Sequence, residues 1–332
     1  MGPLVSILIP AYNAERWISD TIQSALDQTW KHKEIIIVDD GSKDNTLTIA
    51  RRFASKDVLV AQQVNQGASA ARNKAFSLCQ GDFVQWLDAD DLLSPDKVEK
   101  QVALSERLEN RQLLISSPWG YFFYRPHKAT FLKTPLWDDL SPVEWLIRKM
   151  GQNLHMQTAT WLVSRVLVEA AGPWDTRLIS DDDGEYFCRV LLASEGVRFV
   201  PEVRVYYRVS GATSWGNLDR SRKKLEAQWL AMQMHIKYLQ SLEDSNRVRT
   251  ACVRYLQNWF PHFYPEHKDL VSQFEALARE LGSALQLPLL SWKYAWIQKV
   301  FGWTLAKRAR MALPQLKASF IRSYDKFMSQ WE

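Results

Sequence analysis

Short apolar runs alternate with segments of helical periodicity over the first hundred residues of this 332-residue chain. Uninterrupted apolar runs, which are typical of strands covered on both faces, predict strands within residues 4–10, 33–42, 58–63 and 82–91. Apolar residues at helical spacing predict helices within residues 14–28, 44–55, 67–81 and 94–110. This alternation predicts βαβ units, and we therefore expect an α/β fold with a mostly parallel central sheet.

The pattern changes after this first region. Strand-like and helical stretches are mixed up to residue 217, and from residue 218 onward the pattern is helical, with breaks expected at Pro261, Pro265, Pro288 and Pro314. We therefore expect an α/β domain over residues 1–217 and a helical region over residues 218–332. The apolar fraction of 46% and the charged fraction of 24% are those of an ordinary globular protein, which argues against disorder over most of the chain.

The two parts differ in the sign of their charge. Residues 218–332 contain 18 Lys and Arg against 10 Asp and Glu, whereas residues 1–217 contain 24 against 27. The basic part includes a Trp-rich stretch, residues 289–331. Aromatic and basic residues on a helix are typical of an element that lies on anionic lipid; a helical cap packed on the first domain is the alternative. No nucleic-acid-binding motif accompanies the charge, so we do not expect a nucleic-acid partner.

Cysteine usage and hydropathy indicate where the protein works. The cysteines, Cys79, Cys188 and Cys252, lack CxxC spacing and are expected to be reduced. The apolar run at residues 4–10 is too short for a signal-peptide core, and no run approaches the roughly 18 to 20 residues that cross a bilayer. We expect a cytoplasmic protein, either free or bound peripherally at the inner face of the membrane.

Three carboxylates, Asp88, Asp90 and Asp91, follow the apolar run at residues 83–87. Like charges this close repel one another, and a divalent cation would remove that cost. Mg²⁺ and Mn²⁺ prefer carboxylate, phosphate and water oxygens, so the DxD pattern predicts a metal site that recruits a diphosphate. The alternative is a solvated turn in which an Asp caps the next helix.

Other candidate binding residues follow the remaining strands, where ligands of parallel sheets bind. Tyr12, in "PAYN", is either a core aromatic or a stacking platform for a base. Asp40, in "VDDGS", belongs to a turn or accepts a hydrogen bond from a nucleobase. Arg72, in "NQGASAARN", holds a diphosphate bidentately or lies in solvent.

Taken together, these motifs resemble a known family. The order and spacing of "PAYN", "VDDGSKDN", "NQGASAARN" and "DADD" resemble the family 2 glycosyltransferases of the GT-A fold. The resemblance continues in "AGPWDTRLISDDDGEYFCR", which is similar to the family's second signature, and so extends to about residue 210. It implies an inverting, metal-dependent hexosyltransferase-type enzyme that uses Mg²⁺ or Mn²⁺. Such an enzyme moves a sugar from a nucleotide-diphosphate donor to a saccharide or lipid-linked acceptor, as in cell-surface polysaccharide synthesis.

The resemblance also implies roles for individual residues. Tyr12 is expected to stack on the base and Asp40 to accept a hydrogen bond from it. Asp90 is expected to bind the metal, Asp88 to face the ribose or a metal-bound water, and Asp91 to share in metal or sugar contacts. The full set of expected donor-binding residues is Pro10, Tyr12, Asn13, Asp40, Arg72, Asn73 and Asp88.

The family's second signature contains an acidic pair whose second acid is the catalytic base. Alignment on Arg189 places this pair at Asp182 and Asp183, so the resemblance implies that Asp183 takes the proton from the acceptor hydroxyl. The first acid is usually Glu in the family, and a register shift of one residue would make Asp182 the base. Val209 follows Arg208 where the family often has a histidine, so a histidine metal ligand is not supported there.

Two other functions compete with this interpretation. An idle nucleotide-sugar-binding relative or a membrane-recruited scaffold should lack part of the acid set, which is complete here. A nucleotidyltransferase should have a glycine-rich phosphate loop near the N-terminus, and "PAYNAERW" contains no glycine. A glycosyltransferase is therefore the leading interpretation.

Overall fold

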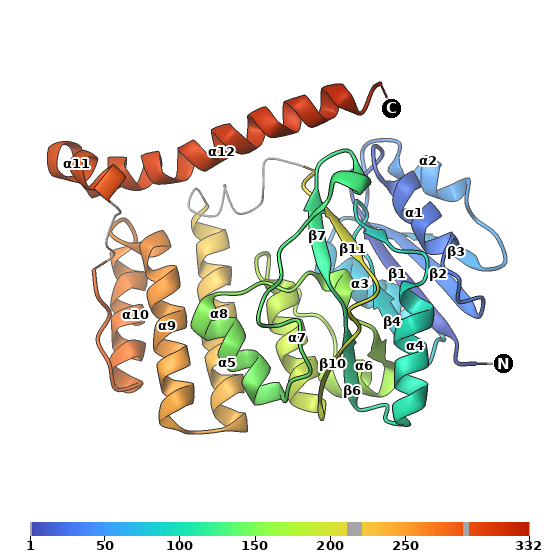
Figure 1. Ribbon diagram of the computed structural model, residues 1–332, viewed down its shortest axis with the longest axis horizontal. Helices are drawn as coiled ribbons and strands as arrows, with labels where there is room; N and C mark the ends of the chain where they lie inside the picture. Colours follow the sequence, from blue (N-terminus) through green and yellow to red (C-terminus); the bar gives the residue numbers. More distant parts are fainter. Residues whose placement is uncertain (1, 211–220, 288–291, 332) are drawn as a thin grey trace.

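The computed structural model describes residues 2–210, 221–287 and 292–331. An α/β part lies beside a stack of helices, and one long C-terminal helix runs across both (Figure 1). The α/β architecture with a mostly parallel sheet, predicted from the sequence, is confirmed. The expected domain boundary at residues 217 and 218 lies outside the described residues, as does the break expected at Pro288.

The central sheet has the strand order β3-β2-β1-β4-β9. Its first four strands pair in parallel, and β9 runs antiparallel beside β4. The chain moves outward from β1 to β3 and then places β4 on the other side of β1, so the switch point lies between β1 and β4. The bounds are β1 Val5–Ala11, β2 Lys33–Asp39, β3 Val58–Gln62, β4 Phe83–Trp86 and β9 Val163–Ser164.

Helices cover both faces of this sheet. Successive residues of β1 point to opposite faces and therefore pack into different cores. Ile7 and Ile9 pack into a core with α1, α2 and α4, whereas Leu8 packs into a second core with α3. Burial on both faces explains why the strands have uninterrupted apolar sequences. The bounds are α1 Ile18–Leu26, α2 Thr46–Arg51, α3 Ala68–Leu78 and α4 Lys97–Leu108.

Two smaller sheets follow, and one of them reaches back to the acids after β4. Strand β11 lies between β5 and β7, and β5 comes directly after the "DADD" segment. Strand β10 pairs with β6. The strand bounds are β5 Leu92–Leu93, β6 Leu113–Ser116, β7 Trp119–Phe122, β8 Thr130–Phe131, β10 Gly196–Phe199 and β11 Val205–Arg208. The helices here are η1 Pro126–Lys128, α5 Pro142–Gln152, η2 Thr158–Thr160, α6 Arg165–Ala171 and α7 Asp182–Ala193.

The C-terminal region is helical, as predicted. Helices α8, α9 and α10 share one apolar core with α3, α5 and α7. Helix α9 ends before Pro265, but Pro261 lies inside α9 and Pro314 inside α12, so the breaks expected at these two prolines are wrong. A proline removes one helical hydrogen bond, and the flanking turns here keep the helix continuous. The bounds are α8 Arg222–Leu242, α9 Asn246–Phe263, α10 Lys268–Glu280, α11 Trp292–Phe301 and α12 Trp303–Met328.

Within the described ranges, none of the helices is long and apolar enough to cross a membrane.

Candidate active site

A cavity of about 550 Å³ opens at the carboxyl ends of β1 and β4, at the switch point of the sheet. Tyr12 is 47% exposed here, so its ring can be reached by a planar ligand. Trp17, Asn65, Gly67 and Ser210 also line this cavity and were not identified from the sequence. The expected residues that line it are Pro10, Tyr12, Asn13, Asp40, Arg72, Asp88 and Asp90.

Asp40 shapes one wall of this cavity. Its buried carboxylate accepts hydrogen bonds from the backbone N–H groups of Gln66 and Gly67, at 2.9 and 2.8 Å. The next residue, Gly41, has φ +70°, and a Cβ there would stand 2.9 Å from the backbone nitrogen of Asn65, so this position requires glycine. Asp40 thus fixes the loop after β3, a role that the sequence did not reveal, and its contact with a base stays a prediction.

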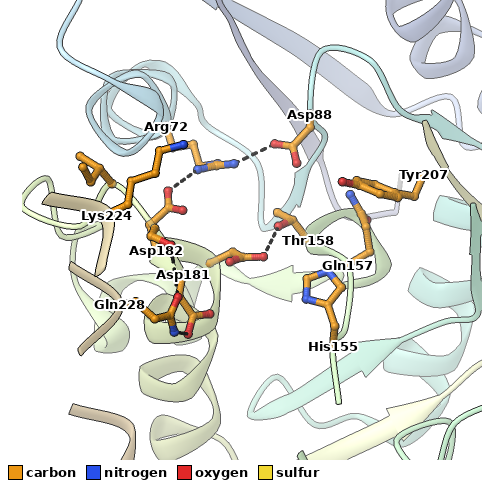
Figure 2. A pocket seen from close by; sticks show the side chains of 13 residues that line it. Arg72, Asp88, His155, Gln157, Thr158, Asp181, Asp182, Tyr207, Lys224 and Gln228 are labelled. Atoms are coloured by element: carbon orange, nitrogen blue, oxygen red, sulfur yellow. Dashed lines mark hydrogen bonds and ion pairs between the residues drawn. The ribbon is translucent and has the colours of Figure 1, made fainter. Parts of the chain in front are cut away.

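A second cavity, of about 230 Å³, shares two lining residues with the first. Figure 2 shows the side chains that line this second cavity. Asp182 and Asp183, at the start of α7, line it, and Arg72 and Asp88 line both cavities. Other lining residues come from η2, β11 and α8, and sequence reasoning missed them because only tertiary packing brings these segments together. They include Gln157, Thr158, Tyr207, Lys224 and Gln228.

Arg72 joins the two acidic segments (Figure 2). Its guanidinium donates to Asp88 Oδ1 at 2.8 Å and to Asp182 Oδ2 at 2.9 Å, and it lies 4.4 Å from the ring centre of Trp174. Burial favours the neutral form, but Asp88 and Asp182 raise the pKa of Arg72 above its ordinary value. Arg72 is 6% exposed, so the alternative that it lies in solvent is wrong, and its contact with a diphosphate stays a prediction.

The two acids of the second signature have different surroundings. Asp182 accepts hydrogen bonds from Arg72 and from Ser69 Oγ, the latter at 3.0 Å. Burial raises the pKa of Asp182, and Arg72 opposes that shift. Asp183 is held by neutral donors, since its oxygens accept from the Gly184 N–H at 2.8 Å and from Thr158 Oγ1 at 3.4 Å. Asp182 Oδ2 is already occupied by Arg72 and Ser69, so access for an acceptor hydroxyl favours Asp183 as the base.

Asp90 and Asp91 point to different places. Asp90 lines the first cavity and accepts a hydrogen bond from Ser210 Oγ at 2.5 Å; burial raises its pKa. Asp91 is fully buried and accepts from the Arg208 N–H at 2.8 Å and from Gln157 Nε2 at 2.5 Å. Burial, with the neighbouring acids, raises the pKa of Asp91 well above its ordinary range. Asp91 lines neither cavity and ties the end of β4 to β11, so the expectation of metal or sugar contacts for Asp91 is corrected.

Asn73 is also outside both cavities. Its side-chain amide donates to the Trp174 carbonyl at 2.9 Å and accepts from the Trp174 N–H at 2.8 Å. The expectation that Asn73 binds the donor is therefore corrected. Its observed role is to hold Trp174 under the guanidinium of Arg72.

Asp88 and Asp90 fit a divalent cation in their chemistry, because both are carboxylates that line the same cavity. Over the part of the chain that the structure describes, no group of three His, Cys, Asp or Glu side chains is arranged to hold a metal ion. Mg²⁺ is often bound by one or two carboxylates together with substrate phosphates and water. Two carboxylates beside a diphosphate would therefore be enough to hold the cation.

A buried histidine behind the second cavity predicts how stability depends on pH. His235 Nδ1 lies 3.0 Å from Tyr255 Oη and 3.9 Å from Asp181, and burial, with Lys149 nearby, lowers the pKa of His235 well below its ordinary value. The unfolded chain therefore binds one more proton below about pH 6.5. The free energy of unfolding should fall as pH drops below that value, by up to about 1.4 kcal/mol per pH unit.

Urea unfolding of the wild type and His235→Gln from acid to neutral pH tests this prediction. The variant should lose that part of the pH dependence, whereas a variant of the exposed His32, His32→Gln, should keep it. An unchanged slope in His235→Gln would contradict the prediction. NMR titration of the imidazole in the folded wild type is an independent check.

Comparison with known proteins agrees with the site. The family model described as glycosyl transferase family 2 matches residues 6–154. An uncharacterized glycosyltransferase of Rickettsia typhi is 32% identical over 230 residues, which are 69% of this chain and 71% of that protein. The putative teichuronic acid biosynthesis glycosyltransferase TuaG of Bacillus subtilis is 47% identical over 103 residues, or 30% of this chain and 41% of TuaG.

Solved structures agree in fold. The crystal structure of S. aureus TarS 1-349 matches with a TM-score of 0.63 at 16% identity, covering 84% of this chain and 79% of that one. Fold and site define a glycosyltransferase of the GT-A type. The chain belongs to glycosyl transferase family 2.

Proposed function

We propose that this glycosyltransferase moves a sugar from a nucleotide-diphosphate donor to a hydroxyl of a saccharide or lipid-linked acceptor, with inversion, in the synthesis of a cell-surface glycan. The observation that carries the proposal is the meeting of two cavities at Arg72 and Asp88. The first cavity has the strand-end residues expected for a donor, and the second has a carboxylate, Asp183, for the acceptor.

The relatives support the choice of substrates. TarS has been crystallised in complex with UDP and with UDP-GlcNAc, and both complexes match this chain with a TM-score of 0.55. TuaG is named for teichuronic acid biosynthesis. We infer a nucleotide-sugar donor and a surface glycan for this chain by analogy with these proteins.

In the proposed mechanism, Asp183 accepts the proton of the acceptor hydroxyl while that oxygen attacks the anomeric carbon. The hydroxyl enters from the second cavity and the diphosphate leaves into the first, so a single displacement inverts the anomeric centre. Asp88 and Asp90 would hold Mg²⁺ or Mn²⁺, which neutralises charge on the leaving diphosphate when bound. Arg72, fixed by Asp182 and Trp174, places a second positive charge between the two cavities.

Calorimetric titration with UDP, GDP and dTDP, each with and without Mn²⁺, tests the donor site. We expect one nucleotide to bind tightly and in a metal-dependent manner. Tyr12→Ala should weaken that binding by about 1–3 kcal/mol, the usual contribution of an aromatic stacked on a base. If the folded protein binds none of the three nucleotides, the proposed donor class is wrong.

A further inference from the structure

The C-terminal part of helix α12 presents aromatic side chains away from the protein. Three large exposed residues, Phe320 (77%), Tyr324 (57%) and Phe327 (56%), lie on one face of α12, and Trp331 (76%), just beyond the end of the helix, has its ring centre 6.1 Å from that of Phe327. The buried polar side chain of this stretch is Asp325, which faces the catalytic domain. A helix on a globular protein normally buries its apolar stripe against that protein, so this arrangement is inverted.

The neighbouring surface is strongly basic. Residues 289–331 contain eight Lys and Arg and one acid, Asp325. Lys299, Arg308, Arg310 and Lys326 are exposed. Trp296, Val300 and Phe301 of α11 extend the exposed apolar surface to the other end of this region.

The one acid is used internally. Asp325 pairs with Arg125 at 2.7 Å and accepts from the Tyr124 N–H at 2.8 Å. Although burial acts to raise it, these hydrogen bonds hold the pKa of Asp325 below its ordinary value, so the carboxylate stays charged. The outward charge of α11 and α12 is therefore almost entirely positive.

These contacts fix α12 beside the mouth of the first cavity. Tyr124 packs against Trp17, which lines that cavity, with ring centres 5.6 Å apart. Arg322 donates to the backbone carbonyl of Ser210, and Ser210 Oγ donates to Asp90. In Figure 1, α12 accordingly passes over the side of the molecule where β7 and β11 end.

We propose that the outward face of α11 and α12 docks on an anionic bilayer surface. The aromatic stripe would enter the interface between head groups and acyl chains, and the basic residues would bind the anionic head groups. The inward contacts of Arg322 and Asp325 would then hold the mouth of the first cavity close to the bilayer. A second copy of this chain fits the face poorly, because two surfaces of the same positive charge would meet.

Vesicle flotation tests the docking surface. The full chain should float with vesicles of phosphatidylcholine and phosphatidylglycerol, and less with vesicles of phosphatidylcholine alone. The triple variant Phe320→Ser, Phe327→Ser and Trp331→Ser should lose binding. A matched variant of apolar residues that are exposed elsewhere, Leu59→Ser, Leu132→Ser and Val166→Ser, should keep it.

A second pair of variants tests the charge. Replacing Lys299, Arg308 and Arg310 by Gln should weaken binding about 100-fold, since each basic residue near an anionic surface contributes about fivefold. Replacing Arg51, Arg52 and Lys56, which are exposed on the α/β domain, should have little effect. Circular dichroism of all four variants serves as the control for folding, and loss of nucleotide binding by a folded variant would bear on the donor site rather than on docking.

Four results would overturn the inference. Equal binding to neutral and anionic vesicles would remove the role of lipid charge. Unchanged flotation of the aromatic variant would remove the stripe from the docking surface. If the wild type does not bind vesicles but forms a dimer that becomes a monomer in the aromatic variant, this face is assigned to a second copy. Tight binding of duplex DNA in place of vesicles would assign the face to nucleic acid.

Discussion

Asp183→Asn should reduce sugar transfer by about 10²- to 10⁴-fold while nucleotide binding stays at the wild-type level. Asparagine keeps the shape of the side chain, and its one oxygen can accept from either Gly184 N–H or Thr158 Oγ1, which bond different oxygens of Asp183, but it cannot take a proton. Donor binding should persist because the first cavity does not include this residue. Initial rates with the donor identified by calorimetry, together with the nucleotide affinity of the same preparation, measure both quantities.

Asp182→Asn provides the matched comparison. This change weakens the ion pair that positions Arg72, which lines both cavities, so nucleotide affinity and transfer should fall together. A pattern in which Asp182→Asn loses only transfer, and Asp183→Asn transfers normally, would assign the base to Asp182 instead. The roles of Asp182 and Asp183 can thus be distinguished by whether each variant changes transfer alone or both transfer and nucleotide affinity.

Asp90→Asn should remove the metal dependence of nucleotide binding. An outer-shell partner of a metal ligand typically contributes about 10- to 100-fold to metal affinity, so the loss of the carboxylate itself should exceed that range. The nucleotide affinity should then be the same with and without Mn²⁺, as measured by calorimetry. Ser210→Ala, which removes the hydrogen bond to Asp90, should produce an intermediate loss.

Asp91→Asn is the control for this experiment. Asp91 is adjacent in sequence but buried away from both cavities, where it is bonded to Arg208 and Gln157. Metal-dependent nucleotide binding should therefore survive in Asp91→Asn. Loss of metal dependence in that variant, with Asp90→Asn unaffected, would reverse the roles that the structure suggests for these two acids.

The periodicity of the chain was sufficient for the α/β architecture. Uninterrupted apolar runs such as "KEIIIVDD" predicted strands buried on both faces, and β2 is such a strand. The prolines of the C-terminal region were less informative, because Pro261 and Pro314 lie within continuous helices. A local rule on helix breaking does not include the packing that keeps a helix intact on both sides of a proline.

The sequence by itself determined which strand ends carry chemistry, since the end of a strand follows from local periodicity. It placed Tyr12, Asp40, Asp88 and Asp90 at such ends, and these residues line one cavity. Side-chain direction could not be obtained in this way. Asp91 turns inward to β11 and Asn73 turns to Trp174, because their partners lie about a hundred residues away in the sequence.

Only the tertiary structure decided how the two signatures meet. Arg72 contacts Asp182, 110 residues further along the chain. This ion pair distinguishes Asp182, which is bound to a cation, from Asp183, which is proposed as the base. The orientation of α12 was decided in the same way, by the pairing of Asp325 with Arg125 across 200 residues. Contacts of this range depend on how packed elements face one another, and hydrophobic periodicity along a single segment carries no information about its partner.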